Sequence, residues 1–265
     1  MAALPAAGYP PAVPPTVALT RRPPRSYQAY YAAQHVSIDL ARADAQHAAY
    51  TKALRSAGLG IEAIDPDERF ADSVFIEDTA VVWQQRALRT RMASHREGEQ
   101  SAVIAYLQRR HEIVTLPPGA TLDGGDVLHA GDLTYVGRSS RTNPAGAAAL
   151  REFLAPRTVV EIPVERCLHL KSAATWLGNG TLLAALDLVD VSAFDVPRVM
   201  FTAAGEDKAA NTLRVGDRLL VLKGYPGTLA ALREFAAEHR VRLSPLDMSE
   251  FEKGDGSLTC LSILL

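Results

Sequence analysis

The sequence predicts an α/β fold in which a strand–strand–helix–strand unit repeats about five times, with about 50 residues in each unit. The clearest observation is a pentapeptide, Ala-Leu-Arg-Glu-Phe, which occurs at residues 149–153 and again at 231–235. Each copy follows two short apolar runs around a Gly-Asp pair, which is typical of a β-hairpin. Each copy also precedes a further predicted strand that ends at Pro163 or just before Pro245.

The first unit begins near the N-terminus. Residues 16–20 predict a strand, which stops at an Arg-Arg-Pro-Pro sequence. Residues 38–57 carry apolar side chains at helical spacing and precede Gly58, which predicts a helix and its end. Residues 59–64 then predict a strand.

Within this unit, residues 25–35 are predicted to be a loop that carries three tyrosines, Tyr27, Tyr30 and Tyr31. Two interpretations are open. The rings either pack on the body of the protein or belong to a lid over a pocket.

Two looser copies of the unit fill the rest of the chain. Residues 79–83 and 87–90 predict strands, and they lead to a helix at 100–110 and a strand at 111–116. Residues 167–190 predict another hairpin followed by a degenerate helix.

Every unit begins near a polar side chain. These residues are Asp72, Asp123, His169, Asn211 and Asp255. In a closed ring the first strand of each unit lines the axis, so we expect these side chains to converge on one central pocket. A doubly wound open sheet is the competing fold, and it would need longer parallel crossovers and fewer hairpins.

The composition bounds the class of protein. A chain of 265 residues suits one large domain or two small ones, and 48% hydrophobic with 22% charged residues is ordinary for a soluble globular protein. The net charge of -2 makes nucleic acid an unfavoured partner. The only two cysteines, Cys167 and Cys260, exclude a disulfide scaffold and fit reduced thiols.

The N-terminal segment, residues 1–15, is rich in alanine and proline and predicts a disordered tail. It lacks the basic and continuous apolar parts of a signal peptide. Residues 16–265 are predicted to be a single α/β domain. No run approaches the roughly 18 apolar residues of a membrane span, so we expect a cytoplasmic protein without a membrane partner.

The C-terminal segment, residues 253–265, combines a Gly-Asp-Gly turn with an apolar run that predicts a buried strand. Cys260 is predicted to lie near the start of this strand. Taken alone, such a thiol is more often a small core side chain than a nucleophile.

Other stretches place polar groups beside apolar ones. Glu77 and Asp78 lead into a predicted strand, and they either bind a cation or cap a solvated loop, since burying an unpaired charge is costly. Asp123 precedes two glycines, which allow close approach to a ligand but also form ordinary turns. Arg141 could bind a carboxylate or phosphate, although solvated arginines are more common. His169 lies between leucines, as core histidines often do.

Together these stretches indicate nucleophilic chemistry. A thiolate needs a base or a cationic neighbour to lower its pKa, and His169 can serve as both. The carboxylates favour a cationic substrate, so attack on a positively charged carbon such as that of a guanidinium is indicated. A zinc site is the competing interpretation, but no Cys-x-x-Cys or His-x-x-x-His spacing supports it.

The motifs resemble those of the dimethylarginine dimethylaminohydrolase family, in the guanidino-group-modifying (pentein) superfamily. The matching stretches follow family order and are residues 38–43, 46–47, 72–78, 122–128, 136–137, 140–143, 169–172, 179–184, 248–253 and 258–262. The resemblance implies a five-bladed α/β propeller around a central channel. It also implies hydrolysis of Nω,Nω-dimethyl-L-arginine or Nω-methyl-L-arginine to L-citrulline, without a metal or organic cofactor.

The resemblance further implies roles for single residues. Cys260 is similar to the nucleophile, which would carry an S-alkylthiouronium intermediate. His169 resembles the general acid and base, and Asp123 the carboxylate that supports it. The implied substrate contacts are Asp72 for the α-amino group, Glu77 and Asp78 for the guanidinium, Arg96 and Arg141 for the α-carboxylate, and Gly254 through its backbone.

Three positions depart from the family pattern. Residues 91–96 lack the usual glycine and prolines, Tyr30 stands near a position that is usually aliphatic, and Gly254 replaces a bulkier apolar residue. All three surround the amino-acid end or the roof of the implied pocket. The resemblance therefore indicates a reaction at a guanidine group more directly than it indicates which substrate carries that group.

Alternative functions stay open at this point. Arginine deiminases and amidinotransferases are related but longer, and a propeller that only binds a ligand is the non-enzymatic alternative. The complete set of Cys260, His169 and Asp123 disfavours the latter. We expect a small-molecule substrate and a monomer or homodimer.

Overall fold

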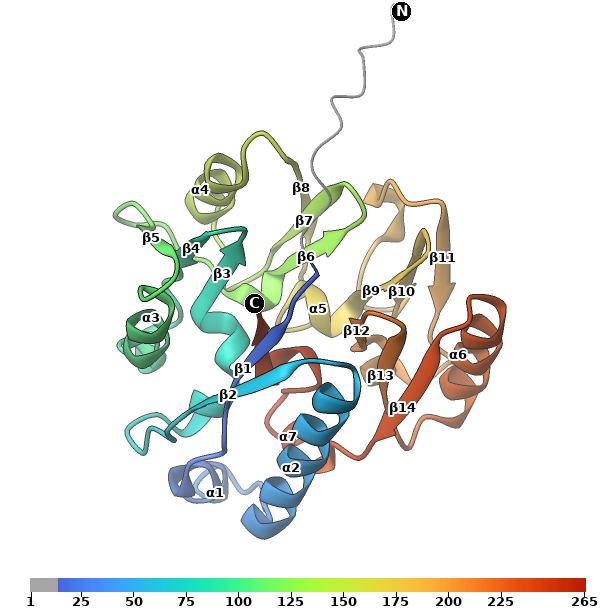
Figure 1. Cartoon of the computed structure of the whole chain (residues 1–265), viewed down its shortest axis with the longest axis horizontal. Helices are drawn as coiled ribbons and strands as arrows, with labels where there is room; N and C mark the ends of the chain where they lie inside the picture. Colours follow the sequence, from blue (N-terminus) through green and yellow to red (C-terminus); the bar gives the residue numbers. More distant parts are fainter. Residues whose placement is uncertain (1–13) are drawn as a thin grey trace, which may run out of the picture.

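Five small sheets make up the protein. The computed structural model describes residues 14–265, and in this range the strands form five three-stranded sheets around a central axis (Figure 1). The predicted propeller of repeated units is therefore confirmed, and the competing doubly wound sheet is wrong. Of the predicted tail, residues 1–15, all but Pro14 and Pro15 lie outside the described residues.

All five blades share one topology. The first strand pairs antiparallel with the second, and the second pairs parallel with the third. From the axis outward the strands are β3 (Ala80–Trp83), β4 (Arg86–Arg89) and β5 (Glu112–Thr115); β6 (Val127–Ala130), β7 (Leu133–Arg138) and β8 (Thr158–Pro163); β9 (Ala174–Gly178), β10 (Thr181–Ala184) and β11 (Arg198–Phe201); β12 (Leu213–Val215), β13 (Arg218–Leu222) and β14 (Arg242–Leu246); and β15 (Ser262–Leu264), β1 (Val17–Arg21) and β2 (Gly60–Ile64).

Helices connect the second and third strands of four blades. They are α2 (Leu40–Ser56), α3 (Ser101–Leu107), α4 (Pro144–Leu154) and α6 (Pro226–Glu238). In the blade of β9 to β11 a single turn of 3-10 helix, Val191–Ala193, takes this place, as the degenerate repeat predicted. A parallel pair needs such a crossover, because the chain must return to the same end of the sheet.

The ring is closed by the two ends of the chain. Strand β15 pairs antiparallel with β1, with Ala18 opposite Leu264. Leu19 and Ile263 are both buried in the apolar cluster that joins this blade to its neighbour. The C-terminal segment is apolar because it is the inner strand of the closing blade.

A one-turn helix precedes the inner strand of every blade. These turns are Ile76–Thr79, Gly124–Asp126, α5 (Leu170–Ala173), Asp207–Ala210 and Thr259–Leu261. The turn Ile76–Thr79 lies against both Gly124–Asp126 and Thr259–Leu261, and α5 contacts Gly124–Asp126. The polar residues at which the units begin were predicted to converge, and this convergence depends on the contacts between these turns. Asp255 does not take part, since it is exposed.

The predicted loop at residues 25–35 is wrong over most of its length, because Arg25–Ala32 form α1. Pro24 precedes the helix, where its fixed φ and missing N–H are tolerated. Tyr27 is fully buried, with its ring 6.0 Å from that of Phe75 and 6.1 Å from that of Phe251. This tertiary packing outweighs the weak helix propensity of tyrosine.

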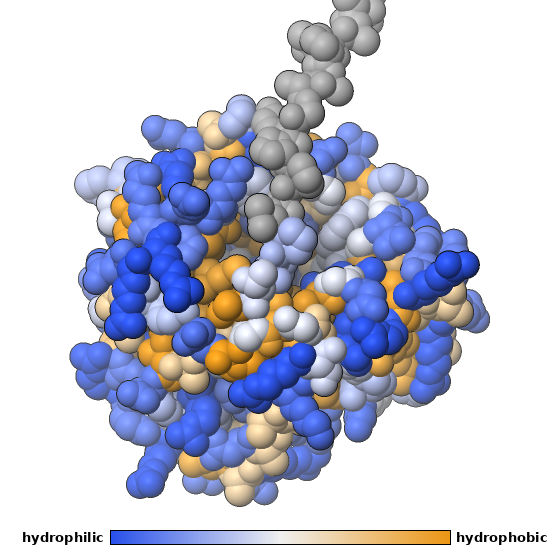
Figure 2. Space-filling view, in the orientation of Figure 1, coloured by the Kyte–Doolittle hydropathy of each residue, from blue (hydrophilic) through white to orange (hydrophobic). Residues whose placement is uncertain are grey.

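The surface separates by polarity. Figure 2 shows apolar residues near the centre of one face and charged residues around its rim.

A further short helix, α7 (Ser249–Glu252), leads to the C-terminal segment. Among residues 14–265, no helix combines the length and hydrophobicity needed to cross a membrane.

Candidate active site

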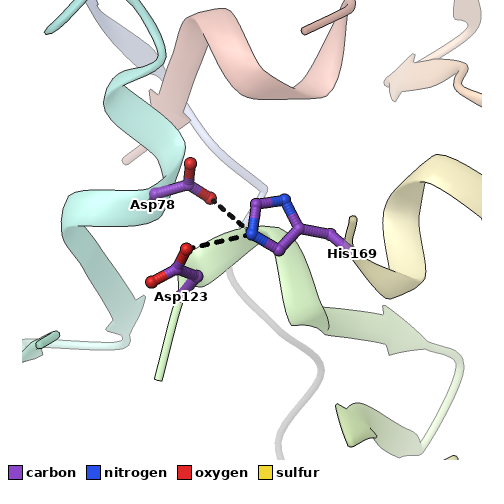
Figure 3. Close-up of side chains that lie close together, drawn as sticks. All are labelled: Asp78, Asp123 and His169. Carbon is purple, nitrogen blue, oxygen red and sulfur yellow. Dashed lines mark hydrogen bonds and ion pairs between the residues drawn. The ribbon is translucent and has the colours of Figure 1, made fainter. Parts of the chain in front are cut away.

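Two carboxylates face one ring nitrogen of His169 (Figure 3). His169 Nε2 lies 3.0 Å from Asp123 Oδ2 and 3.9 Å from Asp78 Oδ1. All three residues are buried. Asp78 lies in the turn Ile76–Thr79, whereas Asp123 and His169 immediately precede the turn Gly124–Asp126 and α5. A Cβ atom on Gly125 would lie 2.6 Å from His169 Nδ1, so glycine is needed for this close approach.

The carboxylates set the charge of His169. Burial disfavours the charged ring, but Asp78 and the hydrogen bond to Asp123 outweigh it and raise the pKa of His169 to about 9. Asp78 in turn stays ionised, because His169 and Arg96 overcome the effect of burial and lower its pKa to about 2. At neutral pH the site therefore holds an imidazolium that donates to Asp123.

This ionisation predicts a pH-dependent stability. The pKa of His169 is about 9 in the folded protein and about 6.5 in an unfolded chain, so its charge stabilises the fold by on the order of 3 kcal/mol. The contribution is complete below pH 6.5 and disappears as the pH rises through 9. Urea unfolding at pH 6.5 and pH 9 is expected to show this loss in the wild type. The loss should be absent in His169→Gln, and an equal loss in both proteins would contradict the assignment.

Arg96 forms a buried ion-pair network. Its Nη1 donates to Asp78 Oδ2 at 2.7 Å, and its Nη2 and Nε donate to the two oxygens of Glu99 at 2.6 and 2.9 Å. Nη2 also donates to the carbonyl oxygen of Phe75 at 3.1 Å. The network fixes the carboxylate of Asp78 beside His169. Sequence reasoning missed Glu99, although its spacing of three residues from Arg96 is a signal for a local pair.

Lys171 and Glu77 form a second ion pair. Lys171 Nζ lies 2.5 Å from Glu77 Oε1, and both side chains line a cavity of about 180 Å³ together with His129. Burial raises the pKa of Glu77, and Lys171 opposes this effect. Lys171 was also missed, although it stands in the His-Leu-Lys-Ser motif.

Cys260 lies in the turn Thr259–Leu261 rather than in the strand, which begins at Ser262. The neighbouring Thr259 is held by Asn211, whose Nδ2 donates to Oγ1 at 3.0 Å and whose Oδ1 accepts from the backbone N–H at 3.1 Å. Burial, together with the charges of Glu77 and Asp78, raises the pKa of the Cys260 thiol to about 12. The resting site therefore carries a thiol rather than a thiolate.

The sequence predicted Asp72, Arg96, Arg141 and Gly254 for the amino-acid end of the pocket. Asp72 Oδ1 accepts a hydrogen bond from the hydroxyl of Tyr31 at 2.9 Å, and Asp72 lines a cavity of about 270 Å³. Arg141 Nη1 lies 3.9 Å from Asp123 Oδ2, which places Arg141 beside the cluster of Asp78, Asp123 and His169.

Three buried atoms of this region have no hydrogen-bond partner within the described part of the chain. They are Glu77 Oε2, Asp123 Oδ1 and Arg141 Nη1. Unpaired buried polar atoms are costly, so each calls for a ligand group. Two acceptors and one donor suit a ligand with a cationic end and an anionic end.

A metal ion is the other class of ligand to consider. One ligand atom each from Asp78, Asp123 and His169 lies within 4.8 Å of the others. However, Asp78 already accepts from Arg96 and from the backbone N–H of Gly125, and His169 is paired with Asp123. The arrangement fits an imidazolium between carboxylates better than three free ligands.

Comparison with known proteins decides the family. The N(G),N(G)-dimethylarginine dimethylaminohydrolase of Streptomyces coelicolor is 39% identical, over 96% of this chain and 98% of its own length. The chain belongs to the dimethylarginine dimethylaminohydrolase family. The family member from Pseudomonas aeruginosa is 34% identical over 92% of this chain and 97% of its own. No protein-family model matches.

A solved structure of the family supports the same assignment. It is a cysteine-to-serine mutant of the Pseudomonas aeruginosa dimethylarginine dimethylaminohydrolase, complexed with citrulline. It is 30% identical, covers 96% of this chain and 100% of its own, and has a TM-score of 0.84. The fold described above is thus the pentein propeller of this family.

Proposed function

We propose that the chain hydrolyses Nω,Nω-dimethyl-L-arginine or Nω-methyl-L-arginine to L-citrulline and dimethylamine or methylamine. The observation that carries this proposal is the set of three buried atoms that lack a hydrogen-bond partner within residues 14–265, on Glu77, Asp123 and Arg141. A substrate with a guanidinium at one end and a carboxylate at the other supplies the missing partners. The family membership points to the same reaction, since a relative was solved with citrulline bound.

In the proposed binding mode, each charged group of the substrate lies beside protein groups of opposite charge. The guanidinium lies among Glu77, Asp78 and Asp123, and Arg141 binds the α-carboxylate through a charge-assisted contact. The α-ammonium lies at Asp72 and the carbonyl oxygen of Gly254. The share of Arg96 in binding the carboxylate stays a prediction, and its contacts with Asp78 and Glu99 support a positioning role.

The first half of the reaction forms the covalent intermediate. The guanidinium charge offsets Glu77 and Asp78, which lowers the pKa of Cys260 and releases its proton to solvent. The thiolate attacks the guanidinium carbon and forms a C–S bond. His169 donates its proton to the leaving nitrogen, the C–N bond breaks, and the amine departs from an S-alkylthiouronium cation.

The second half regenerates the enzyme. His169, now neutral, takes a proton from a water molecule as the water oxygen attacks the same carbon. The C–S bond breaks and Cys260 leaves as a thiolate. The new hydroxyl then loses one proton, which restores the Cys260 thiol and gives the urea group of citrulline. Asp123 holds the ring in place through both proton transfers.

The test is citrulline release from Nω,Nω-dimethyl-L-arginine, Nω-methyl-L-arginine and L-arginine, measured side by side with the same enzyme preparation. We expect turnover of the methylated substrates. Turnover of L-arginine alone would contradict the substrate assignment while leaving the mechanism in place. No turnover of any of the three would favour the propeller that only binds a ligand.

We further propose that residues 16–265 act as one catalytic domain, in the cytoplasm, as a monomer or homodimer. Two free thiols, Cys167 and Cys260, support a reducing compartment. One set of inward-facing turns supports a single site for each chain.

A further inference from the structure

The hydroxyl of Tyr31 lies between the two groups assigned to the substrate α-ammonium. It donates to Asp72 Oδ1 at 2.9 Å and lies 3.3 Å from the carbonyl oxygen of Gly254. A donor that reaches both acceptors stands where an ammonium would bind them. Tyr31 is half-buried at the C-terminal end of α1, which lies beside the blade of β15, β1 and β2 (Figure 1).

The absence of a side chain at position 254 belongs to the same arrangement. A Cβ atom on Gly254 would lie 2.7 Å from the hydroxyl oxygens of both Tyr27 and Tyr31. The two rings meet edge to face at 5.0 Å, and the Tyr27 hydroxyl donates to the carbonyl oxygen of Glu250 at 3.0 Å. Gly254 therefore departs from the family pattern because two phenols fill the space of a larger side chain.

We propose that Tyr31 is a specificity-determining residue. Its hydroxyl occupies the α-amino position in the free protein, and only a ligand with a charged amine displaces it. This proposal rests on the proposed function for its assignment of Asp72 and Gly254. A neutral hydroxyl offers one hydrogen, whereas an ammonium offers three and makes stronger, charge-assisted bonds to a carboxylate. A ligand without the α-amino group leaves the tyrosine in place and gains nothing at Asp72.

The consequence is a selective effect of removing the hydroxyl. In Tyr31→Phe an amine no longer competes with a hydrogen bond inside the protein, so amine-bearing ligands should bind about 2- to 10-fold more tightly. Ligands without the amine never displace the hydroxyl, and their affinity should stay unchanged. A general change in packing would shift both kinds of ligand together.

The experiment is calorimetric titration of wild type and Tyr31→Phe with L-citrulline and with 5-ureidopentanoate, which differs only by lacking the α-amino group. We expect tighter L-citrulline binding in the variant and an unchanged dissociation constant for 5-ureidopentanoate. Tyr106→Phe is the matched control, because Tyr106 lies on α3 and lines neither of the two cavities described above. It should change neither constant.

Weaker L-citrulline binding in Tyr31→Phe would overturn the proposal, since the hydroxyl would then assist the amine. Equal shifts for both ligands, no shift at all, or no binding of either ligand to the wild type would overturn it too. The titration does not depend on turnover. Failure of the proposed function would instead be visible in the citrulline-release assay.

Discussion

Cys260→Ser is expected to abolish citrulline formation, with a loss in kcat on the order of 10⁴-fold or more. A serine hydroxyl is a far weaker nucleophile than a thiolate, and burial with the charges of Glu77 and Asp78 opposes an anion at position 260 more than Lys171 favours one. The substitution is small, so the fold and the binding of L-citrulline should persist. Citrulline release and calorimetric binding of L-citrulline measure the two effects separately.

Cys167→Ser is the matched control for this substitution. The Cys167 thiol donates to the carbonyl oxygen of His169 at 3.3 Å, and a serine hydroxyl can donate to the same oxygen. Burial raises the pKa of Cys167 to about 11, so it too is a thiol at neutral pH. We expect Cys167→Ser to retain activity within a few-fold. An inactive Cys167→Ser beside an active Cys260→Ser would reverse the assignment of the nucleophile.

Arg96→Met is expected to lower the free energy of unfolding by about 3–5 kcal/mol. The substitution keeps much of the side-chain volume but removes the cation between two buried carboxylates, Asp78 and Glu99. An uncompensated buried charge must either stay unpaired or take up a proton, and both cost stability. Urea denaturation at pH 7, followed by circular dichroism, measures the change.

Arg69→Met is the control that isolates the effect of burial on the contribution of an ion pair to stability. Arg69 Nη2 lies 2.7 Å from Asp67 Oδ2, the same separation as in the pair of Arg96 with Asp78. The Arg69 side chain is 74% exposed, whereas that of Arg96 is 6% exposed. An exposed pair contributes about 1 kcal/mol at most, so Arg69→Met should change stability little. Similar small losses in the two variants, with a raised KM only in Arg96→Met, would instead support the predicted role of Arg96 in binding the carboxylate.

The sequence by itself determined the repeat, the order of the elements and the chemical character of the site. Helix α2 and the hairpins of β6 with β7 and β12 with β13 follow from local periodicity and from Gly-Asp turns, which require no distant partner. The motifs around His169 and Cys260 identified the family for the same reason, because each motif is a short contiguous stretch.

Only the tertiary structure decided how these stretches meet. Helix α1 exists because Tyr27 packs against Phe75 and Phe251, and Arg96 faces Asp78 because two separate turns come together.

The hydroxyl of Tyr31 reaches Asp72 across 41 positions of sequence, and Lys171 reaches Glu77 across 94. Such contacts depend on how distant segments of the chain pack together. They carry no local periodicity or spacing from which the sequence alone could predict them.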